Sequence, residues 1–392
     1  MATENWLDAH IDQLIALRRE LHADPELLYD LPRTAARIAA ALRAAGCDEV
    51  VEGIGGTGVV AVIRGQSDTR GRMIGLRADM DALPIQEASG KPWASRSPGR
   101  MHACGHDGHC AMLLGAAVGL AQGRAFDGRV VLIFQPAEEG GAGARAMIED
   151  GLFQRWPVQE VYGMHNRPNL PVGAFTIAPG PIMGSVDMIE IEIEGVGGHA
   201  AMPHQTIDTI PAAAALIQAV QAIAARSIDP LDSAVISITT IHAGDAFNVI
   251  PQTLRLSGTV RTLRAEVRDH IEARLAQAVQ GIATGYGAQG RLTYARHYPV
   301  TVNHRAETEN AARAAEAVTG PARVSRTMPP TLGGEDFAFM LEARPGAMIN
   351  IGNGPGPGLH HPAYDFNDDA IVWGTSYWCE LVRQRLSRHA AA

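Results

Sequence analysis

The sequence predicts an α/β fold with a largely parallel sheet, interrupted by a smaller inserted domain. Over the first half of the chain, short apolar runs such as GVVAVIRG and RVVLIF alternate with helical patterns, which is typical of parallel sheets covered by helices. From about residue 184 the order becomes β-α-β-β-α-β, as in ferredoxin-like modules. The α/β pattern resumes after about residue 297, so the second module is an insertion.

The elements of the first half follow from local patterns. The opening stretch, residues 1–22, predicts an amphipathic helix and carries acids where a secretion signal would be basic. Apolar runs then predict strands, and longer patterns with helical spacing predict helices. The strands are expected at residues 58–65, 73–78, 129–134 and 160–164, and the helices at 109–123 and 143–150.

The inserted module begins with VDMIEIEIEG, in which apolar and acidic residues alternate strictly, as in a strand with one face in water. Its other elements are a helix at 210–226, strands at 233–244 and 253–262, a helix at 265–287 and a strand at 291–298. The first domain is completed by helices at 306–318 and 370–386 around a strand at 347–353. The predicted boundaries are 1–183 with 297–392 for the larger domain, and 184–296 for the insertion.

Size and composition narrow the class of protein. At 392 residues the chain exceeds one ordinary core, and 46% hydrophobic content supplies material for two. The net charge of -9 argues against nucleic acid as a partner but leaves room for a local basic pocket. Four unevenly spaced cysteines are typical of reduced thiols rather than a disulfide framework, and no apolar run is expected to span a membrane. A cytoplasmic protein is therefore expected.

Metal-competent side chains follow three of the predicted strands. Asp79 and Asp81 come after one strand, Glu138 and Glu139 after another, and His165 after a third. Because ligands bind beyond the carboxyl ends of parallel strands, these residues are expected at one edge of the sheet. The adjacent glutamates repel each other unless a positive charge lies close by. A turn exposed to solvent would explain one pair of acids after a strand. It does not explain why three separate strands are each followed by residues that can bind a metal.

The stretch MHACGHDGHC is the densest in chemistry. Cys104 and His106 lie in a glycine-punctuated loop before a helix and are suited to Zn, Co, Ni or Mn. The competing interpretation is a nucleophilic cysteine with a histidine partner, which leaves the two glutamates without a role. His102, Asp107 and His109 are expected to be structural or to support the ligands.

The motifs RADMDALP, MHACGHDGH, FQPAEEGGAGARAMIEDGLF, GMHNRP, GGHAAMPH, FNVIP, GGEDFAFML and LHHPAYDFND closely resemble the M20 metallopeptidase family. The resemblance is to its amidohydrolase branch, which includes hippurate hydrolases, N-acyl-amino-acid amidohydrolases and auxin-conjugate hydrolases. It covers nearly the whole chain in the expected order. It implies a two-metal catalytic domain interrupted by a smaller lid, which is also used for dimerisation.

The resemblance also implies roles for individual residues. Cys104 would bridge two divalent ions (Mn, Zn, Co or Ni), with His106 and His165 on one ion. Glu139 and His360 would hold the other, because the family pattern of His, any residue, then Pro selects His360 over His361.

Three residues near the two ions have further expected roles. Glu138 would be the general base. Asp79 would orient a metal-ligating histidine, and Arg77 stands where other M20 enzymes carry a ligand histidine. The role of Asp81 is left open between a cap and a solvated loop residue.

In the lid, His199 is expected to stabilise the oxyanion of the tetrahedral intermediate. Asn248 and Arg261 are candidates for gripping the substrate carboxylate, although Arg261 also fits a surface ion pair at a strand end. Glu335 and Asp336 are expected to open a helix, where acids complement the helix dipole.

The implied reaction is hydrolysis of an N-acyl amino acid, a small-molecule substrate, to a carboxylate and a free amino acid. A dipeptidase, a carboxypeptidase or an N-acetyl-diaminopimelate-type deacetylase could use the same two-metal machinery. A catalytically silent binding protein on this fold would have lost ligands or the base, whereas every expected position is filled. The resemblance further implies a homodimer formed through the lid.

Overall fold

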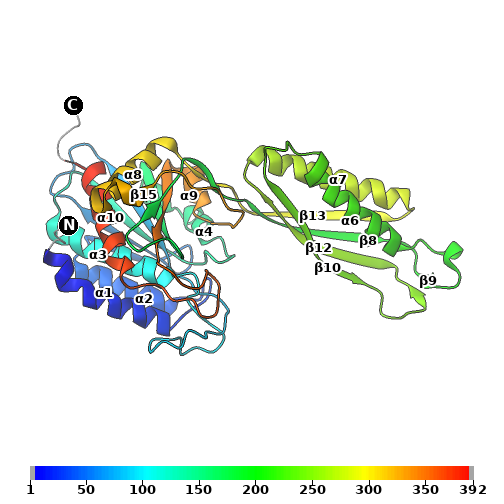
Figure 1. Ribbon diagram of the computed structural model, residues 1–392, viewed down its shortest axis with the longest axis horizontal. Helices are drawn as coiled ribbons and strands as arrows, with labels where there is room; N and C mark the ends of the chain where they lie inside the picture. The colour runs from blue at the N-terminus through cyan, green and yellow to red at the C-terminus, as the bar shows by residue number, and fades with distance from the viewer. Residues whose placement is uncertain (1–4, 388–392) are drawn as a thin grey trace. The chain divides into compact units, whose positions relative to one another are not determined.

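The computed structural model describes residues 5–387 and divides into two compact units (Figure 1). Unit 1 comprises Met1–Gly180, Val302–Met328 and Asp336–Ala392, and unit 2 comprises Pro181–Thr301 and Pro329–Glu335. The first four residues of the predicted N-terminal helix lie outside the described part. Catalytic and lid roles for these two units stay predictions.

Unit 1 is built on a mixed sheet of eight strands. In spatial order they are β1 (Glu49–Ile54), β2 (Gly58–Arg64), β4 (Arg129–Gln135), β3 (Met73–Asp79), β5 (Glu160–Arg167), β16 (Gly346–Gly352), β6 (Phe175–Thr176) and β15 (Val324–Ser325). The four central strands, β4, β3, β5 and β16, are mutually parallel. Their carboxyl ends therefore meet at one edge, as the sequence predicts.

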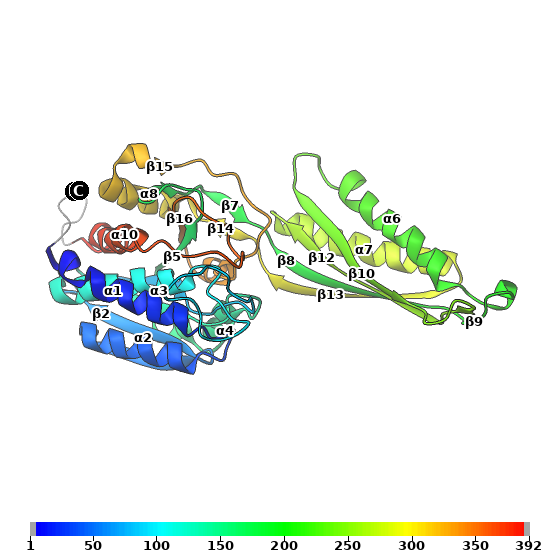
Figure 2. The same ribbon diagram turned by 60° about the horizontal axis from the view of Figure 1, so that its bottom comes forward.

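Helices cover this sheet and supply its core. They are α1 (Asn5–Ala23), α2 (Pro32–Ala45), α3 (His106–Gly123), α4 (Gly143–Glu149), α5 (Leu152–Arg155), α8 (Arg305–Thr319), α9 (Ala338–Ala343) and α10 (Ala370–Arg385). α1 and α10 pack against α3, and Figure 2 shows α1, α2 and α3 side by side. Leu7, Leu14 and Leu21 recur every seven residues of α1 and are buried, and each contributes about 1.5–3 kcal/mol.

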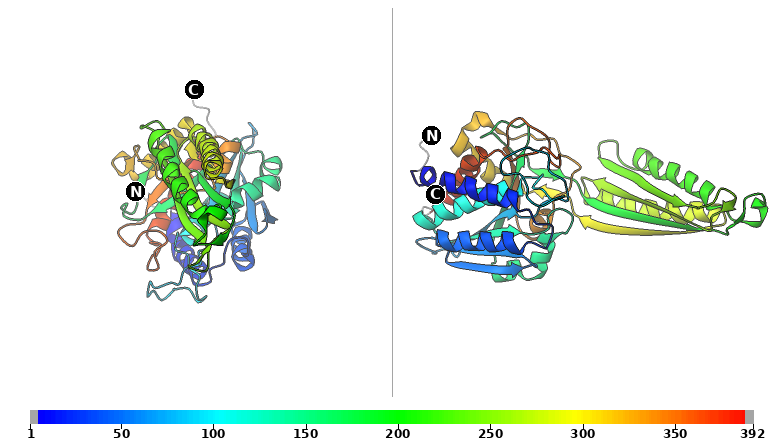
Figure 3. Two further views of the ribbon diagram at one scale, coloured as in Figure 1. Left: turned by 90° about the vertical axis from the view of Figure 1, so that its right-hand side faces the viewer. Right: turned by 90° about the horizontal axis from the view of Figure 1, so that it is seen from below.

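Unit 2 carries a four-stranded antiparallel sheet in the order β10-β12-β8-β13. Its elements are β8 (Val186–Glu194), β9 (Gly198–His199), α6 (Thr209–Arg226), β10 (Ala234–Ala243), β11 (Val249–Ile250), β12 (Thr253–Thr262), α7 (Ala265–Gly285) and β13 (Gln289–Tyr298). The isoleucines of β8 are buried and its glutamates lie on the other face, as strict alternation requires. α6 and α7 cover one face of this sheet (Figure 3). This is the ferredoxin-like arrangement expected from the sequence.

Two short strands, β7 (Gly180–Met183) and β14 (Thr301–Asn303), lie where the chain passes between the units. Helix α6 is, among the described residues, the one helix long and apolar enough to meet the length and composition of a membrane span. The sequence was not expected to contain such a run. Residues Ala212, Leu216 and Val220 of α6 are buried in the core of unit 2, on the face of the helix that packs against the sheet.

Candidate metal centre

The three strands that were expected to deliver ligands are neighbours in the order β4-β3-β5. Asp79 is the last residue of β3, the Glu138–Glu139 pair follows β4, and His165 lies near the end of β5. The loop before α3 brings Cys104 to the same edge, next to His165. Parallel pairing thus gathers residues from four separate stretches of sequence.

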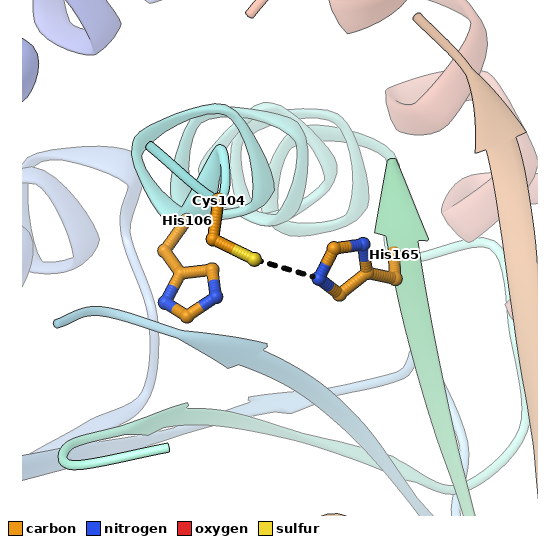
Figure 4. Close-up of side chains that lie close together, drawn as sticks. All are labelled: Cys104, His106 and His165. Carbon is orange, nitrogen blue, oxygen red and sulfur yellow. Dashed lines mark hydrogen bonds between the residues drawn. The ribbon is translucent and has the colours of Figure 1, made fainter. Parts of the chain in front are cut away.

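Cys104, His106 and His165 form the first candidate ligand group, with one donor atom from each within 4.8 Å of the others (Figure 4). The Cys104 Sγ and His165 Nε2 atoms are 3.3 Å apart. His165 Nδ1 donates a hydrogen bond to the Asn166 carbonyl at 2.7 Å. That bond leaves the lone pair on Nε2, the nitrogen that faces Cys104, as metal ligation requires.

Cys104, Glu139 and His360 form a second group, again within 4.8 Å. His360 Nε2 lies 3.3 Å from Glu139 Oε1. The backbone of His360 has a φ of 63°, a left-handed conformation that costs about 1–3 kcal/mol for a residue other than glycine. Its N–H donates to the Ala103 carbonyl at 2.8 Å, which ties the His360 loop to the loop that carries Cys104. Cys104 belongs to both groups, as a ligand that bridges two ions would.

The donor atoms at this centre fit a cation. Within residues 5–387, both ring nitrogens of His106 are buried without a hydrogen-bond partner. Asp79 and Asp81 oxygens lie 3.6 and 3.5 Å from the His106 nitrogens, beyond hydrogen-bond range. An unsatisfied buried polar atom costs about 1–3 kcal/mol, which a bound ion would remove. Thiolate, imidazole and carboxylate together suit Zn, Co, Ni or Mn better than Ca.

Electrostatics also favour positive charge here. Burial lowers the pKa of His106, but three neighbouring carboxylates, led by Asp79, outweigh it and raise the pKa to about 10. Burial likewise raises the pKa of Asp79, yet Arg77 and His106 bring it well below its ordinary value. Burial lowers the pKa of His165 to about 4, so this ring is neutral and able to bind a metal. The negative potential that holds a proton on His106 would equally attract a divalent ion.

The turn that carries the adjacent glutamates is held by Asp81. Its Oδ1 accepts from the Glu138 backbone N–H and its Oδ2 from that of Glu139, each at 3.0 Å. Ala137, just before them, has a left-handed φ of 52°. Asp81 is fully buried, so of the two roles left open by the sequence the structure supports the cap. Glu138 also forms a possible ligand group with His106 and Glu139.

We expect Asp81→Asn to lower kcat about 10–100-fold, because an amide offers one acceptor oxygen where the turn needs two. One buried backbone N–H would then lack a partner, so the free energy of unfolding should fall by about 1–3 kcal/mol. Steady-state kinetics and urea unfolding would measure the two effects. The control is Asp150→Asn. Asp150 also accepts a hydrogen bond from a backbone N–H, that of Gly55 at 2.9 Å, but it belongs to none of the ligand groups. An unchanged kcat in the Asp81 variant would remove the positioning role.

Asp79 hydrogen-bonds to His109 and Arg77, and its expected role of orienting a ligand histidine stays a prediction. Its Oδ1 accepts from His109 Nδ1 at 2.6 Å and its Oδ2 from Arg77 at 2.8 Å, whereas His106 is 3.6 Å away. His109 Nε2 in turn accepts from the Asn166 N–H at 3.0 Å. His109 therefore joins the ends of β3 and β5, and whether it also supports the ligands stays a prediction.

A buried polar network behind the centre was not predicted from the sequence. Asp336 does not lie in α9, which begins at Ala338. It accepts hydrogen bonds from Arg77 at 3.1 Å, Gln135 at 2.8 Å and the Ala144 N–H at 2.9 Å. The sequence does hold a signal for this network. Arg77 interrupts the apolar run of β3 and Gln135 ends that of β4, and buried polar side chains need hydrogen-bond partners.

The remaining predicted residues belong to unit 2. β9 pairs with β11, which sets His199 opposite Val249 and next to Asn248, whose carbonyl accepts the Ala200 N–H at 3.0 Å. β12 begins at Thr253, and Arg261 is the residue before its last. At about 3.3 Å per residue, Arg261 lies roughly 25 Å from Thr253. Its Nη1 is buried with no hydrogen-bond partner in the described chain. Asn248 comes just before β11 and Arg261 lies near the end of β12, so the two residues lie towards opposite ends of this unit.

Comparisons with known proteins agree with this geometry. A sequence profile of peptidase family M20/M25/M40 matches residues 75–384. An N-acetylcysteine deacetylase from Bacillus subtilis (strain 168) is 42% identical, covering 94% of this chain and 96% of that protein. A hippurate hydrolase from Campylobacter jejuni is 40% identical over 94% and 96% of the two chains.

A solved structure is similar over the same length. The Bacillus subtilis YXEP protein, described as a dinuclear metal binding peptidase from the M20 family, has 37% identity and a TM-score of 0.85. The match covers 97% of this chain and 100% of that chain.

Proposed function

Because this chain belongs to peptidase family M20/M25/M40 and is a metal-dependent amidohydrolase, we propose that its substrates are N-acyl amino acids. Hydrolysis of their amide bond would give a carboxylate and a free amino acid. The observation that carries this proposal is the pair of ligand groups that share Cys104, with Glu138 beside them. The deacetylase and the hippurate hydrolase, both similar over nearly their full lengths, support the substrate class.

The two groups would hold two divalent ions. Cys104, His106 and His165 would bind one, and Cys104, Glu139 and His360 the other. When bound, such ions polarise a carbonyl and lower the pKa of coordinated water towards about 7. Cys104 would then serve as a ligand rather than as a nucleophile, because its sulfur lies in both groups.

Glu138 is the proposed general base and general acid. Its backbone is fixed by Asp81, so its carboxylate can take a proton from the attacking water at a defined place. The same proton would pass to the departing amide nitrogen, which leaves as an amine. Glu139, held by the other oxygen of Asp81 and close to His360, is reserved for metal. The adjacent glutamates therefore divide two tasks between them.

Unit 2 would supply contacts to the substrate. His199 is the proposed donor to the oxyanion, and Asn248 and Arg261 are the proposed partners of the free carboxylate. Because Asn248 and Arg261 lie towards opposite ends of unit 2, a substrate shared between them would take one residue from each of two copies. This separation supports the proposed homodimer through unit 2.

A substrate panel on metal-reconstituted protein tests the function. We expect EDTA to abolish hydrolysis and Mn, Co or Zn to restore it, with hippurate and N-acetyl amino acids turned over faster than dipeptides. Amine release would be measured for hippurate, N-acetylcysteine, N-acetyldiaminopimelate and a dipeptide. Preference for the dipeptide would favour a peptidase instead. Metal binding without turnover of any of them would indicate a silent binding protein.

A further inference from the structure

A buried arginine on α1 has no role in the chemistry described above. Arg18 lies between Leu14 and Leu21 on the buried face of α1, and its side chain is 0% exposed. A charge in an otherwise apolar stripe costs free energy unless it is paired, so its partners identify its role.

The first partner of Arg18 belongs to the Cys104 loop. Its Nε lies 2.8 Å from Oδ2 of Asp107, which is also 0% exposed. Asp107 is the residue directly after the candidate ligand His106, in the first turn of α3. His22, one turn after Arg18 on α1, also contacts Asp107 Oδ2 at 2.8 Å. Asp107 is thus held from α1 by two side chains.

The second partner belongs to the loop that carries the other metal position. Arg18 Nη2 donates to Asp365 Oδ1 at 2.7 Å, and Nη1 lies 3.6 Å from Asp368. Both acids lie in the segment between β16 and α10, which also contains His360. The Arg18 guanidinium therefore contacts both Asp107, which follows His106, and Asp365, which lies in the same loop as His360.

Packing makes this connection stiff. Phe366 lies so close to Gly108 that a Cβ there would be 2.3 Å from its ring, and the Arg18 guanidinium lies 5.7 Å from the ring centre. A Cβ on Gly105 would be 2.5 Å from the Tyr364 hydroxyl. The His360 loop is thus seated directly on the start of α3. A planar guanidinium can contact two acids in fixed directions, which the single ammonium of lysine cannot do.

We propose that Arg18 is a positioning residue that couples the two metal positions by fixing Asp107 and Asp365 at a set separation. The inference rests on the proposed two-metal centre. Through Asp107 it holds the loop of Cys104 and His106, and through Asp365 it holds the loop of His360. Loss of either contact should let His360 move relative to Cys104 and weaken the ion that these two residues share.

The test is calorimetric titration of the metal-free full chain with Mn²⁺. Arg18→Lys and Asp365→Asn should each lower the affinity for the ion proposed at Cys104, Glu139 and His360 about 10–100-fold, as for other residues that support ligands. The affinity for the ion proposed at Cys104, His106 and His165 should stay within about twofold of wild type. Arg19→Lys is the matched control, because Arg19 pairs with Asp368 and stacks on Trp93 without contacting Asp107. Thermal unfolding of each apo protein would show that it is folded.

Each outcome decides one question. If Arg18→Lys does not fold, Asp365→Asn decides, since Asp365 is at the margin of the network with 14% of its side chain exposed. Wild-type affinity for both ions in Asp365→Asn would overturn the coupling, and so would an equal loss in Arg19→Lys. If the wild-type protein itself binds fewer than two ions, the two-metal proposal fails first, and that result is seen without any variant.

Discussion

Glu138→Gln is expected to keep its metal ions and to lose turnover, with kcat lower by about 10²–10⁴-fold. The amide is close in size to the carboxylate, so the turn held by Asp81 should persist through the Glu138 N–H. It cannot accept a proton at neutral pH, so the attacking water would lack its base. Because the substrate would still bind, KM should change far less than kcat.

Steady-state kinetics on hippurate, with metal content measured on the same samples, would check this result. Glu149→Gln is the matched control, because Glu149 is an exposed residue of α4 that pairs with Arg145 at 4.0 Å and belongs to none of the ligand groups. It should retain wild-type kcat. A Glu138→Gln variant with more than about a tenth of wild-type kcat would show that another group moves the proton.

Cys104→Ala is expected to lose affinity for both ions, by more than the roughly 10–100-fold that follows loss of a supporting residue. The reason is that Cys104 is the member common to both ligand groups, whereas His165 and His360 each belong to one. His165→Ala should therefore weaken mainly one ion, and His360→Ala mainly the other. Calorimetry with Mn²⁺ or Zn²⁺ on the three variants would separate a shared from an unshared ligand.

The same variant separates two kinds of chemistry. If Cys104 were a nucleophile, Cys104→Ala would abolish turnover and leave metal binding intact, and EDTA would not inhibit the wild-type protein. Cys47→Ala is the control for loss of a thiol, because Cys47 is half-buried in unit 1 and belongs to none of the ligand groups. It should bind both ions with wild-type affinity.

Much of the fold was predictable because the strongest local signals coincide with buried elements. The strict alternation of Ile and Glu in β8 predicts a strand with one buried face and one exposed face. The apolar runs of β2 and β4 each lie between two other strands of a sheet covered by helices. The strand ends then predict where ligands meet, since parallel strands place their carboxyl ends together.

The functions of Asp81, Asp336 and Arg18 were not predictable from local sequence. Asp81 holds the backbone of residues 57 and 58 positions away, and Arg18 contacts an acid 347 positions away. No periodicity or spacing rule reports such partners, because they depend on how distant loops pack. The sequence does show that polar residues interrupt apolar stretches, as Arg18 does in α1, and these positions are where a search for buried networks should begin.

Anomalous diffraction from crystals soaked with Co²⁺ or Zn²⁺ would test the proposed centre most directly. Two peaks are predicted, with Cys104 Sγ bonded to both ions, His106 and His165 on one, and Glu139 and His360 on the other. Glu138 should contact neither ion through its side chain. A single peak, or two peaks with Cys104 outside bonding distance of both, would contradict the two-metal mechanism.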